Sequence, residues 1–358
     1  MAKITLQDLR HSYSPEPKGD DDYALKRISL DWADGGAYAL LGPSGCGKTT
    51  LLNLISGLLV PTEGQILFDG RDVSRATPEQ RNIAQVFQFP VIYDTMTVYD
   101  NLAFPLRNRR IGEAAVDARV REIAAMLDLS KTLKNRASGL TADGKQKISL
   151  GRGLVRSDVN VIMFDEPLTV IDPHLKWQLR SKLKELHQRI RRTMIYVTHD
   201  QTEALTFADQ VVVMNNGEVV QTGTPIDLFE RPMHTFVGHF IGSPGMNLLP
   251  CEVVGGVASF AGQAVATANA GGYKGAGGKL ELGVRPEFVS FAGDGIAADV
   301  VKVADAGRFR IVETRAAGKS IKLLVPEGDA IPAGKAHLAF DPSHTQVYEN
   351  GWIVGVRP

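Results

Sequence analysis

A glycine-rich segment near the N-terminus has the residue types and the spacing of a phosphate-binding loop. It fits the pattern G-x-x-x-x-G-K-[ST] and lies between the apolar run Ala37–Leu41 and the helix-like stretch Thr50–Leu59. Glycines allow a backbone to wrap phosphates, and the N–H groups at a helix N-terminus point toward an anion. We expect Lys48 to span the terminal phosphates and Thr49 to ligate magnesium; a turn that only caps a helix is the alternative. The residues expected to contact the nucleotide here are Gly42, Pro43, Ser44, Gly45, Cys46, Gly47, Lys48, Thr49 and Thr50.

Two acidic residues end a later apolar run. Asp165 and Glu166 directly follow Val161–Phe164, as expected where a buried parallel strand delivers side chains at its carboxyl end. We predict that Asp165 orients the magnesium and that Glu166 polarises the attacking water. Acidic residues after a strand also favour a helix N-terminus, but their position downstream of a phosphate-binding loop favours the catalytic interpretation.

A histidine and a glutamine complete the set of residues that could take part in catalysis or metal binding. His199 follows the apolar run Tyr196–Thr198 and is expected at the same edge of the sheet as the two acids. A single histidine at a strand end is often structural, and that alternative stays open. Gln88, in the segment Val86–Pro90, is expected to reach the metal and the water; a loop glutamine without a function is its alternative.

The elements that must position these residues follow an α/β pattern. Up to about Gly242, short β-branched runs alternate with longer amphipathic stretches, which predicts a largely parallel sheet. A helix is predicted over residues 174–192, because its leucines share one face, and a mostly helical insert is predicted over 96–156, with one helix at 113–129. The expected central strands are Ala37–Leu41, Val159–Phe164, Met194–Thr198 and Gln210–Met214.

The composition changes after Gly245. Glycine, alanine and valine dominate, in short alternating segments that are separated by turns, such as Gly255-Gly256 and Gly271-Gly272. Such a pattern is typical of a small β-barrel or sandwich. The chain is therefore expected to hold a domain over residues 1–242 and a smaller all-β domain over 243–358.

Charge and cysteine content limit the classes of partner. Forty basic and forty acidic residues give a formal net charge of zero, so we do not expect nucleic acid as a partner. The only cysteines, Cys46 and Cys251, lie far apart, which favours a reduced, cytosolic setting. The start, Met1–Arg10, has no signal-peptide pattern, and no apolar run is long enough to span a membrane, so we expect any membrane association to depend on a partner.

The order of these motifs resembles that of ABC transporter ATPases. The resemblance covers essentially the whole chain and includes Thr169–Asp172, which is similar to the D-loop of that family, with Asp172 as its acid. It also implies that Tyr13 stacks on adenine. Thr198–Ala204, Gly223–Pro225 and Gly283–Glu287 are similar to the carbohydrate-importer branch of the family.

That branch implies the nature of the C-terminal domain and of the transported solute. Its members carry a C-terminal OB-like (TOBE) barrel that serves subunit contact and regulation, so the name of the barrel implies no nucleic acid here. Within the branch, Gln88–Leu106 and the departure described next resemble importers for glycerol or glycerol phosphate of rhizobia-like bacteria, which use two different ATPase subunits.

One segment departs from the family pattern. The family signature reads Leu-Ser-Gly-Gly-Gln, but Thr141, Ala142, Asp143 and Gly144 follow Leu140 in that position. In the family, the signature of one subunit closes over the ATP bound to the other. An aspartate ~6 Å from a phosphate charge would repel it by roughly 3 kcal/mol at an effective dielectric constant near 20. We therefore expect a different ATPase subunit to supply the working signature; a tolerated drift, with the aspartate turned away, is the alternative.

The resemblance implies an ATPase that uses ATP and Mg²⁺ at the cytoplasmic face of the inner membrane. Its implied partners are two transmembrane permease subunits, a second ATPase subunit and, indirectly, a periplasmic solute-binding protein. The expected solute is a small polyol, sugar or sugar phosphate. A P-loop GTPase or small-molecule kinase, a non-transport ABC ATPase and a catalytically silent regulatory subunit are the alternatives; the absence of an Asn-Lys-x-Asp motif argues against the GTPase.

Overall fold

The computed structural model describes residues 2–275 and 277–355, so residues 1, 276 and 356–358 of the two predicted domains lie outside the described range. The chain divides into two compact units, Met1–Pro225 and Ile226–Pro358. Because residues 226–242 are grouped with the second unit, the domain boundary expected between residues 242 and 243 stays a prediction. Among the described residues, no helix combines the length and the apolar character that crossing a membrane requires.

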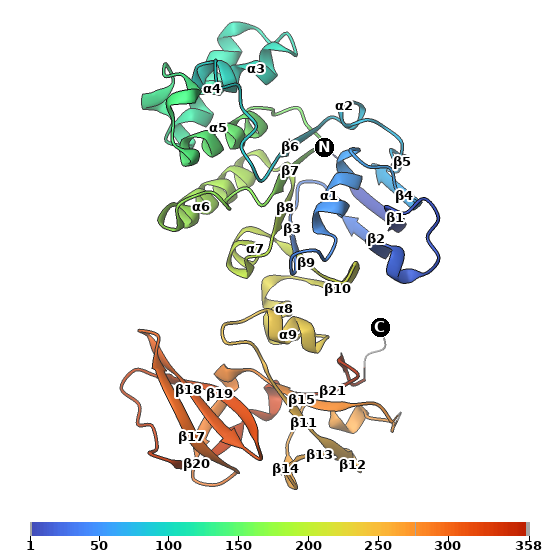
Figure 1. Cartoon of the computed structure of the whole chain (residues 1–358), viewed down its shortest axis with the longest axis vertical. Coiled ribbons are helices and arrows are strands. Elements are labelled where there is room, and N and C mark those ends of the chain that lie inside the picture. Colours follow the sequence, from blue (N-terminus) through green and yellow to red (C-terminus); the bar gives the residue numbers. More distant parts are fainter. Residues whose placement is uncertain (1, 276, 356–358) are drawn as a thin grey trace. The chain divides into compact units, whose positions relative to one another are not determined.

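A six-stranded sheet forms the centre of the first unit (Figure 1). Its order is β10-β9-β3-β8-β7-β6; the neighbours from β9 to β6 run parallel, and β10 is antiparallel to β9. Strands β3, β7 and β8 are fully buried, which explains their continuous apolar sequences. The strands of this sheet are β3 (Ala37–Leu41), β6 (Ile83–Val86), β7 (Val161–Asp165), β8 (Thr193–Thr198), β9 (Gln210–Asn215) and β10 (Glu218–Gly223).

A second, antiparallel sheet packs into the same core. Its order is β2-β1-β4-β5, and leucine and isoleucine side chains from it share one hydrophobic cluster with α1 and with the central sheet. This packing fixes the start of α1 relative to the ends of β7 and β8. The strands of this second sheet are β1 (Ile4–His11), β2 (Leu25–Trp32), β4 (Glu63–Phe68) and β5 (Arg71–Asp72).

The helices of the first unit fall into two groups. Figure 1 shows α3, α4 and α5 gathered as a helical insert between β6 and β7, and α5 packs on β6. In the second group, α7 packs on the central sheet through Phe207, whose ring contacts Tyr196 of β8. The helices are α1 (Lys48–Ser56), α2 (Pro78–Arg81), α3 (Val98–Arg107), α4 (Glu113–Met126), α5 (Ala142–Leu154), α6 (Pro173–Ile190) and α7 (Gln201–Phe207).

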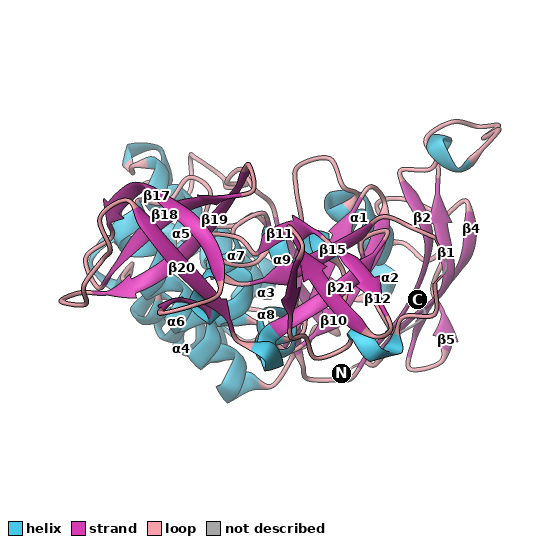
Figure 2. Ribbon diagram, turned by 90° about the horizontal axis from the view of Figure 1, so that it is seen from below, coloured by secondary structure: helices cyan, strands magenta, loops and turns pink. Residues whose placement is uncertain are grey.

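The second unit is built mainly from antiparallel strands around its own core. Figure 2 shows β17, β18, β19 and β20 side by side; with β16 they form one sheet in the order β16-β20-β17-β18-β19. Its helices are α8 (Pro225–Glu230) and α9 (Thr235–Phe240). Its strands are β11 (Asn247–Pro250), β12 (Glu252–Val254), β13 (Val257–Phe260), β14 (Gln263–Val265), β15 (Leu280–Val284), β16 (Val289–Ala292), β17 (Ile296–Asp305), β18 (Phe309–Ala316), β19 (Lys319–Pro326), β20 (Lys335–Phe340), β21 (Thr345–Glu349) and β22 (Trp352–Ile353).

The predicted fold class is confirmed, with small shifts at element ends. The predicted strand at 37–41 is β3 without change, whereas β7 begins at Val161 rather than at residue 159. Helix α4 ends at Met126 instead of residue 129, since Leu127 and Asp128 leave the helical conformation, Asp128 with a positive φ of 58°. Helix α1 begins at Lys48 and so includes the end of the phosphate-binding pattern.

Candidate active site

The glycine-rich loop joins β3 to α1, and its backbone conformation requires glycine. Gly47 is the N-cap of α1 with φ 102°, and a Cβ there would lie 2.6 Å from Leu25 Cδ2. A Cβ on Gly42 would lie 2.2 Å from the carbonyl oxygen of Met214. Pro43, Ser44 and Gly45 complete the turn. These close contacts explain the positions of the glycines in the motif.

Lys48 and Cys46 point into this loop. The buried Lys48 ammonium donates to the carbonyl oxygens of Gly42 at 2.9 Å and Pro43 at 2.8 Å. Burial raises the pKa of the Cys46 thiol, so this free cysteine stays a neutral packing residue. Lys48 therefore places a positive charge beside the uncapped start of α1, the arrangement that an anionic phosphate group needs.

Thr49 and Asp165 meet where β7 ends beside α1. The Thr49 Oγ1 lies 3.3 Å from Asp165 Oδ1. Burial is the main reason that the pKa of Asp165 is raised, and the adjacent Glu166 charge raises it further. A divalent cation would reverse this effect and would hold the carboxylate in its charged form.

These oxygen ligands fit Mg²⁺. In the described part of the chain, no three histidine, cysteine or acidic side chains gather into a metal site of their own. A Mg²⁺ ion commonly takes only one or two protein ligands and completes its shell with phosphate oxygens and water. The hydroxyl of Thr49 and the carboxylate of Asp165 match that requirement.

Glu166 lies at the centre of a cluster of polar side chains. Its Oε1 lies 3.1 Å from His199 Nδ1, and its Oε2 accepts hydrogen bonds from Gln88 Nε2 and Thr169 Oγ1, each at 3.4 Å. The backbone of Glu166 has φ 45°, a conformation that side-chain-bearing residues rarely adopt. The structure thus brings the predicted base, histidine and glutamine together at the carboxyl ends of β6, β7 and β8.

Tyr13 lies at the edge of this region, in the loop after β1. Its ring is 65% exposed and packs edge-on against His11, with the ring centroids 4.9 Å apart. The Tyr13 hydroxyl lies 3.1 Å from Thr50 Oγ1 in the first turn of α1. An exposed aromatic face tied to the phosphate-binding helix is suited to stacking on a base.

The signature-like segment forms the start of α5. Thr141 is the N-cap, and its Oγ1 accepts a hydrogen bond from Gly144 N at 3.2 Å. Asp143 Oδ2 lies 3.0 Å from Lys147 Nζ, while its Oδ1 is buried without a hydrogen-bond partner. The negative charge expected at Asp143 is therefore paired, within this chain, with the lysine one turn later. Ala142 is exposed in the first turn.

The D-loop-like segment leads into α6. Asp172 is the N-cap of α6, and its Oδ1 accepts from His174 N at 2.9 Å. Its side chain is exposed and belongs to the helix start rather than to the cluster around Glu166. The position of Asp172 therefore does not indicate that it joins the cluster around Glu166 in binding a nucleotide on the same chain.

Sequence reasoning placed Thr169 only in the D-loop-like segment and did not single out Gln146. Thr169 Oγ1 contacts the Glu166 carboxylate, and the buried Gln146 of α5 donates to the carbonyl oxygen of Pro167 at 2.8 Å and to that of Phe87 at 3.4 Å. Gln146 thereby links the helical insert to the segments next to Glu166 and Gln88. The sequence signal that could have indicated it is its position two residues after Gly144, the end of the signature-like segment.

The fold and this site together define an ABC-type ATPase. A family profile described as "ABC transporter" matches residues 25–169, and one described as "MalK OB fold domain" matches residues 242–289. A solved structure described as cbiO1 from Clostridium perfringens, part of the ABC transporter complex cbiONQ, aligns with a TM-score of 0.57 and 26% identity over 64% of this chain and 90% of that one.

Sequence relatives agree with this class. The chain is 38% identical to the sn-glycerol-3-phosphate import ATP-binding protein UgpC of Jannaschia sp. (strain CCS1) over 98% of each protein. It is 44% identical to UgpC 3 of Rhizobium etli over 71% of each. The chain therefore belongs to the family of ABC-transporter ATP-binding subunits that carry a MalK-type OB domain, and its activity is ATP hydrolysis coupled to transport.

Proposed function

We propose that the chain powers the import of sn-glycerol 3-phosphate, or of glycerol, by hydrolysing ATP at the site around Glu166. The observation that carries the catalytic part is the contact of Glu166 with His199, at 3.1 Å, beside the loop that holds Lys48. A carboxylate kept in place by an imidazole and an amide is positioned to direct water onto a terminal phosphate. The solute is inferred from the names of the UgpC relatives.

Each side chain has a separate task in this proposal. Lys48 and the N–H groups at the start of α1 bind the phosphates, and Tyr13 stacks on adenine. Glu166 accepts a proton from the attacking water, while His199 stabilises the charge that develops on the transferred phosphoryl group. Thr49, Asp165 and Gln88 would hold Mg²⁺, which when bound neutralises charge on the phosphate oxygens.

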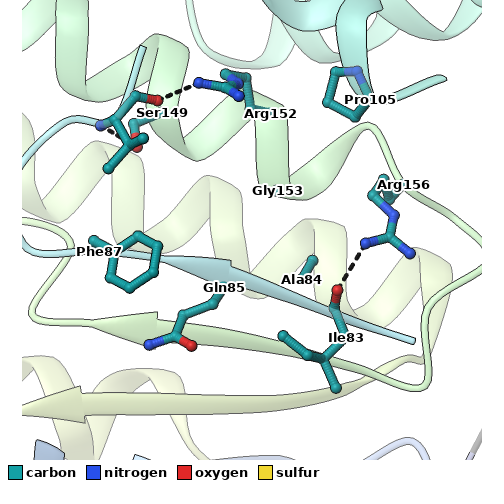
Figure 3. Close-up of a pocket in the computed structure, with 10 residues that line it drawn as sticks. Ile83, Ala84, Gln85, Phe87, Pro105, Ser149, Arg152, Gly153 and Arg156 are labelled. Carbon is teal, nitrogen blue, oxygen red and sulfur yellow. Dashed lines mark hydrogen bonds between the residues drawn. The ribbon is translucent and has the colours of Figure 1, made fainter. Parts of the chain in front are cut away.

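We propose that permease subunits contact the chain at Phe87, the residue before Gln88 in the sequence (Figure 3). A pocket of about 240 Å³ lies there, lined by β6, Phe87 and residues of α3 and α5. In Figure 3, Arg156 reaches the carbonyl oxygen of Ile83, at 2.7 Å, and Arg152 lies along the same wall. Apolar and cationic lining favours a permease segment with an acidic side chain. The chain would then act as a peripheral subunit at the cytoplasmic face of the inner membrane, with a periplasmic binding protein delivering the solute.

We propose further that a different ATPase subunit completes the site that holds ATP on this chain. Ala142 and Asp143 stand where the family has two glycines, so the first turn of α5 offers less room for a phosphate. The ion pair with Lys147 removes most of the charge repulsion, so steric hindrance and self-capping by Thr141 support this pairing more than charge does. A homodimer is the competing assembly.

The experiment is to purify the chain with its permeases and to compare the stimulation of ATP hydrolysis by sn-glycerol 3-phosphate, glycerol and maltose, each with the cognate binding protein. We expect stimulation by one of the first two. Stimulation by maltose alone would refute the proposed assignment of the solute. Absence of ATP hydrolysis under every condition would refute the proposed catalytic role of the chain. Native mass spectrometry of the same complex would show one or two kinds of ATPase subunit.

A further inference from the structure

A buried carboxylate lies behind His199, outside the set of residues assigned above. Glu203 belongs to α7 and is 3% exposed. Its Oε2 accepts hydrogen bonds from Thr198 Oγ1 at 2.9 Å and from Tyr196 OH at 3.1 Å. Its Oε1 lies 3.6 Å from Lys176 Nζ on α6. Glu203 therefore joins β8, α6 and α7 through polar contacts in an otherwise apolar region.

The contacts of Glu203 reach the backbone on both sides of His199. The Thr198 hydroxyl donates to Glu203 and accepts a hydrogen bond from the backbone N–H of Asp200 at 3.0 Å. Asp200 in turn caps α7, because its Oδ1 accepts from the N–H of Thr202 at 2.7 Å. The residue between these two anchors is His199, whose ring contacts Glu166. A shift of Thr198 would therefore move the imidazole.

The cost of burying Glu203 indicates that the network does more than fill space. Removing a carboxylate from water costs several kcal/mol unless hydrogen bonds and a counter-charge compensate, and apolar residues often pack such a position equally well. Here every contact is with a hydroxyl or with Lys176, and burial raises the pKa of Tyr196 well above its usual value, so its hydroxyl stays a donor. The arrangement favours one fixed geometry of the Thr198–Asp200 segment.

We propose that Glu203 is a positioning residue for His199: through Thr198 it holds the imidazole against the Glu166 carboxylate. The proposal rests on the catalytic role of His199 given above. Since Lys176 lies one turn after Asp172, with its N–H bonded to the Asp172 carbonyl oxygen at 3.1 Å, the same network ties the start of α6 to the position of His199.

The test uses ATP hydrolysis by the complete transporter. Glu203→Gln keeps the volume but removes the charge and presents an amide N–H₂ to groups that are themselves donors. We expect kcat to fall about ten- to a hundredfold, as for other small displacements of a catalytic group, while KM for ATP is unchanged. Thr198→Val should reproduce this loss, and Thr198→Ser should restore turnover. Tyr196→Phe, which removes a donor from the same oxygen away from His199, is the matched control and should keep kcat.

A double-mutant cycle separates positioning from a general structural role. If Glu203 acts through His199, adding Glu203→Gln to His199→Ala should not lower the residual rate further. A further loss as large as in the wild-type background would overturn the proposal, as would full kcat in Glu203→Gln or in Thr198→Val. If Glu203→Gln does not fold, the two Thr198 variants decide alone. Normal turnover in His199→Ala would instead refute the proposed catalytic site.

Discussion

The loop before α1 and the first turn of α5 are both helix starts that contain glycine, but they are built in opposite ways. At α1 the N-cap is Gly47, which has no side chain, so the first N–H groups of the helix are free for an anion. At α5 the N-cap is Thr141, whose hydroxyl accepts from Gly144 N, and an acid occupies the first turn. The N–H groups at the start of α1 are therefore free to bind phosphate. At the start of α5, by contrast, the N–H of Gly144 is already bonded to the Thr141 side chain.

Charge sharpens this contrast. Lys48 adds a buried positive charge to the start of α1, while Asp143 of α5 uses Lys147 of its own helix as its partner. A helix N-terminus attracts anions through its dipole, and an acid in the first turn already uses that attraction. The difference supports the proposal that this chain holds phosphate at the start of α1, whereas the start of α5 is already occupied by its own side chains.

The largest expected effect concerns Glu166, which lies beside the phosphate-binding loop before α1. Glu166→Gln should lower kcat at least about a hundredfold, because an amide cannot accept a proton from water. ATP binding should persist, since Lys48 and the backbone of the loop are unchanged. Turnover in the complete transporter and titration with a fluorescent ATP analogue measure the two quantities. Glu185→Gln, an exposed position on α6, is the control; substantial turnover in Glu166→Gln would remove Glu166 from the role of base.

The second prediction tests whether the open helix start depends on its close packing. Gly47→Ala places a Cβ 2.6 Å from Leu25 Cδ2 and 2.9 Å from the Ala24 carbonyl oxygen at φ 102°. Relieving about 2 kcal/mol of such strain would displace the loop, so we expect ATP affinity to fall by roughly an order of magnitude or more.

Gly70→Ala supplies the control for the second prediction. Gly70 also has a positive φ, of 78°, but no atom lies within 4 Å of its added Cβ, and it lies in the turn between β4 and β5. The variant should therefore lose some stability and no affinity for ATP, as measured by thermal unfolding and nucleotide titration. Equal losses of affinity in the two variants would show that φ strain alone, rather than the packing around Gly47, causes the effect.

The placement of Asp165, Glu166 and His199 at one edge of the sheet could be predicted from the sequence, whereas the ion pair within α5 could not, for a physical reason. A phosphate-binding loop, Asp165, Glu166 and His199 are short motifs at strand ends, and parallel strands must bring such ends to one edge of the sheet. The ion pair of Asp143 with Lys147 depends on a rotamer choice within one helix, which the spacing permits but does not require. The hydrogen bonds of the buried Glu203 could likewise not be predicted from the sequence, because hydrogen bonds between separate elements have no sequence pattern.

The third prediction tests whether the start of α5 can be made similar to the start of α1 by removing side chains from its first turn. Ala142→Gly with Asp143→Gly removes a methyl group and the acid from the first turn. If the closed start limits a homodimer, ATP hydrolysis by the purified chain alone should rise severalfold, the equivalent of about 1 kcal/mol. Lys147→Met, which breaks the ion pair and leaves Asp143 unpaired, should not raise it. Cooperative hydrolysis at transporter-like rates by the unaltered chain would contradict the proposed pairing with a second ATPase subunit.

The smallest expected effect comes from the remaining glycine of the closed start. A Cβ on Gly144 would meet Leu140 Cβ at 3.2 Å, a tight contact, but Gly144 lies in a helix and has no positive φ that forbids a side chain. Alanine gains roughly 0.5–1 kcal/mol of helix propensity over glycine, which should offset that contact. We expect Gly144→Ala to change the free energy of unfolding by less than about 1 kcal/mol in chemical denaturation. A loss several times larger would mean that the start of α5 is packed as tightly as the loop before α1, and that the two helix starts differ in capping and charge alone.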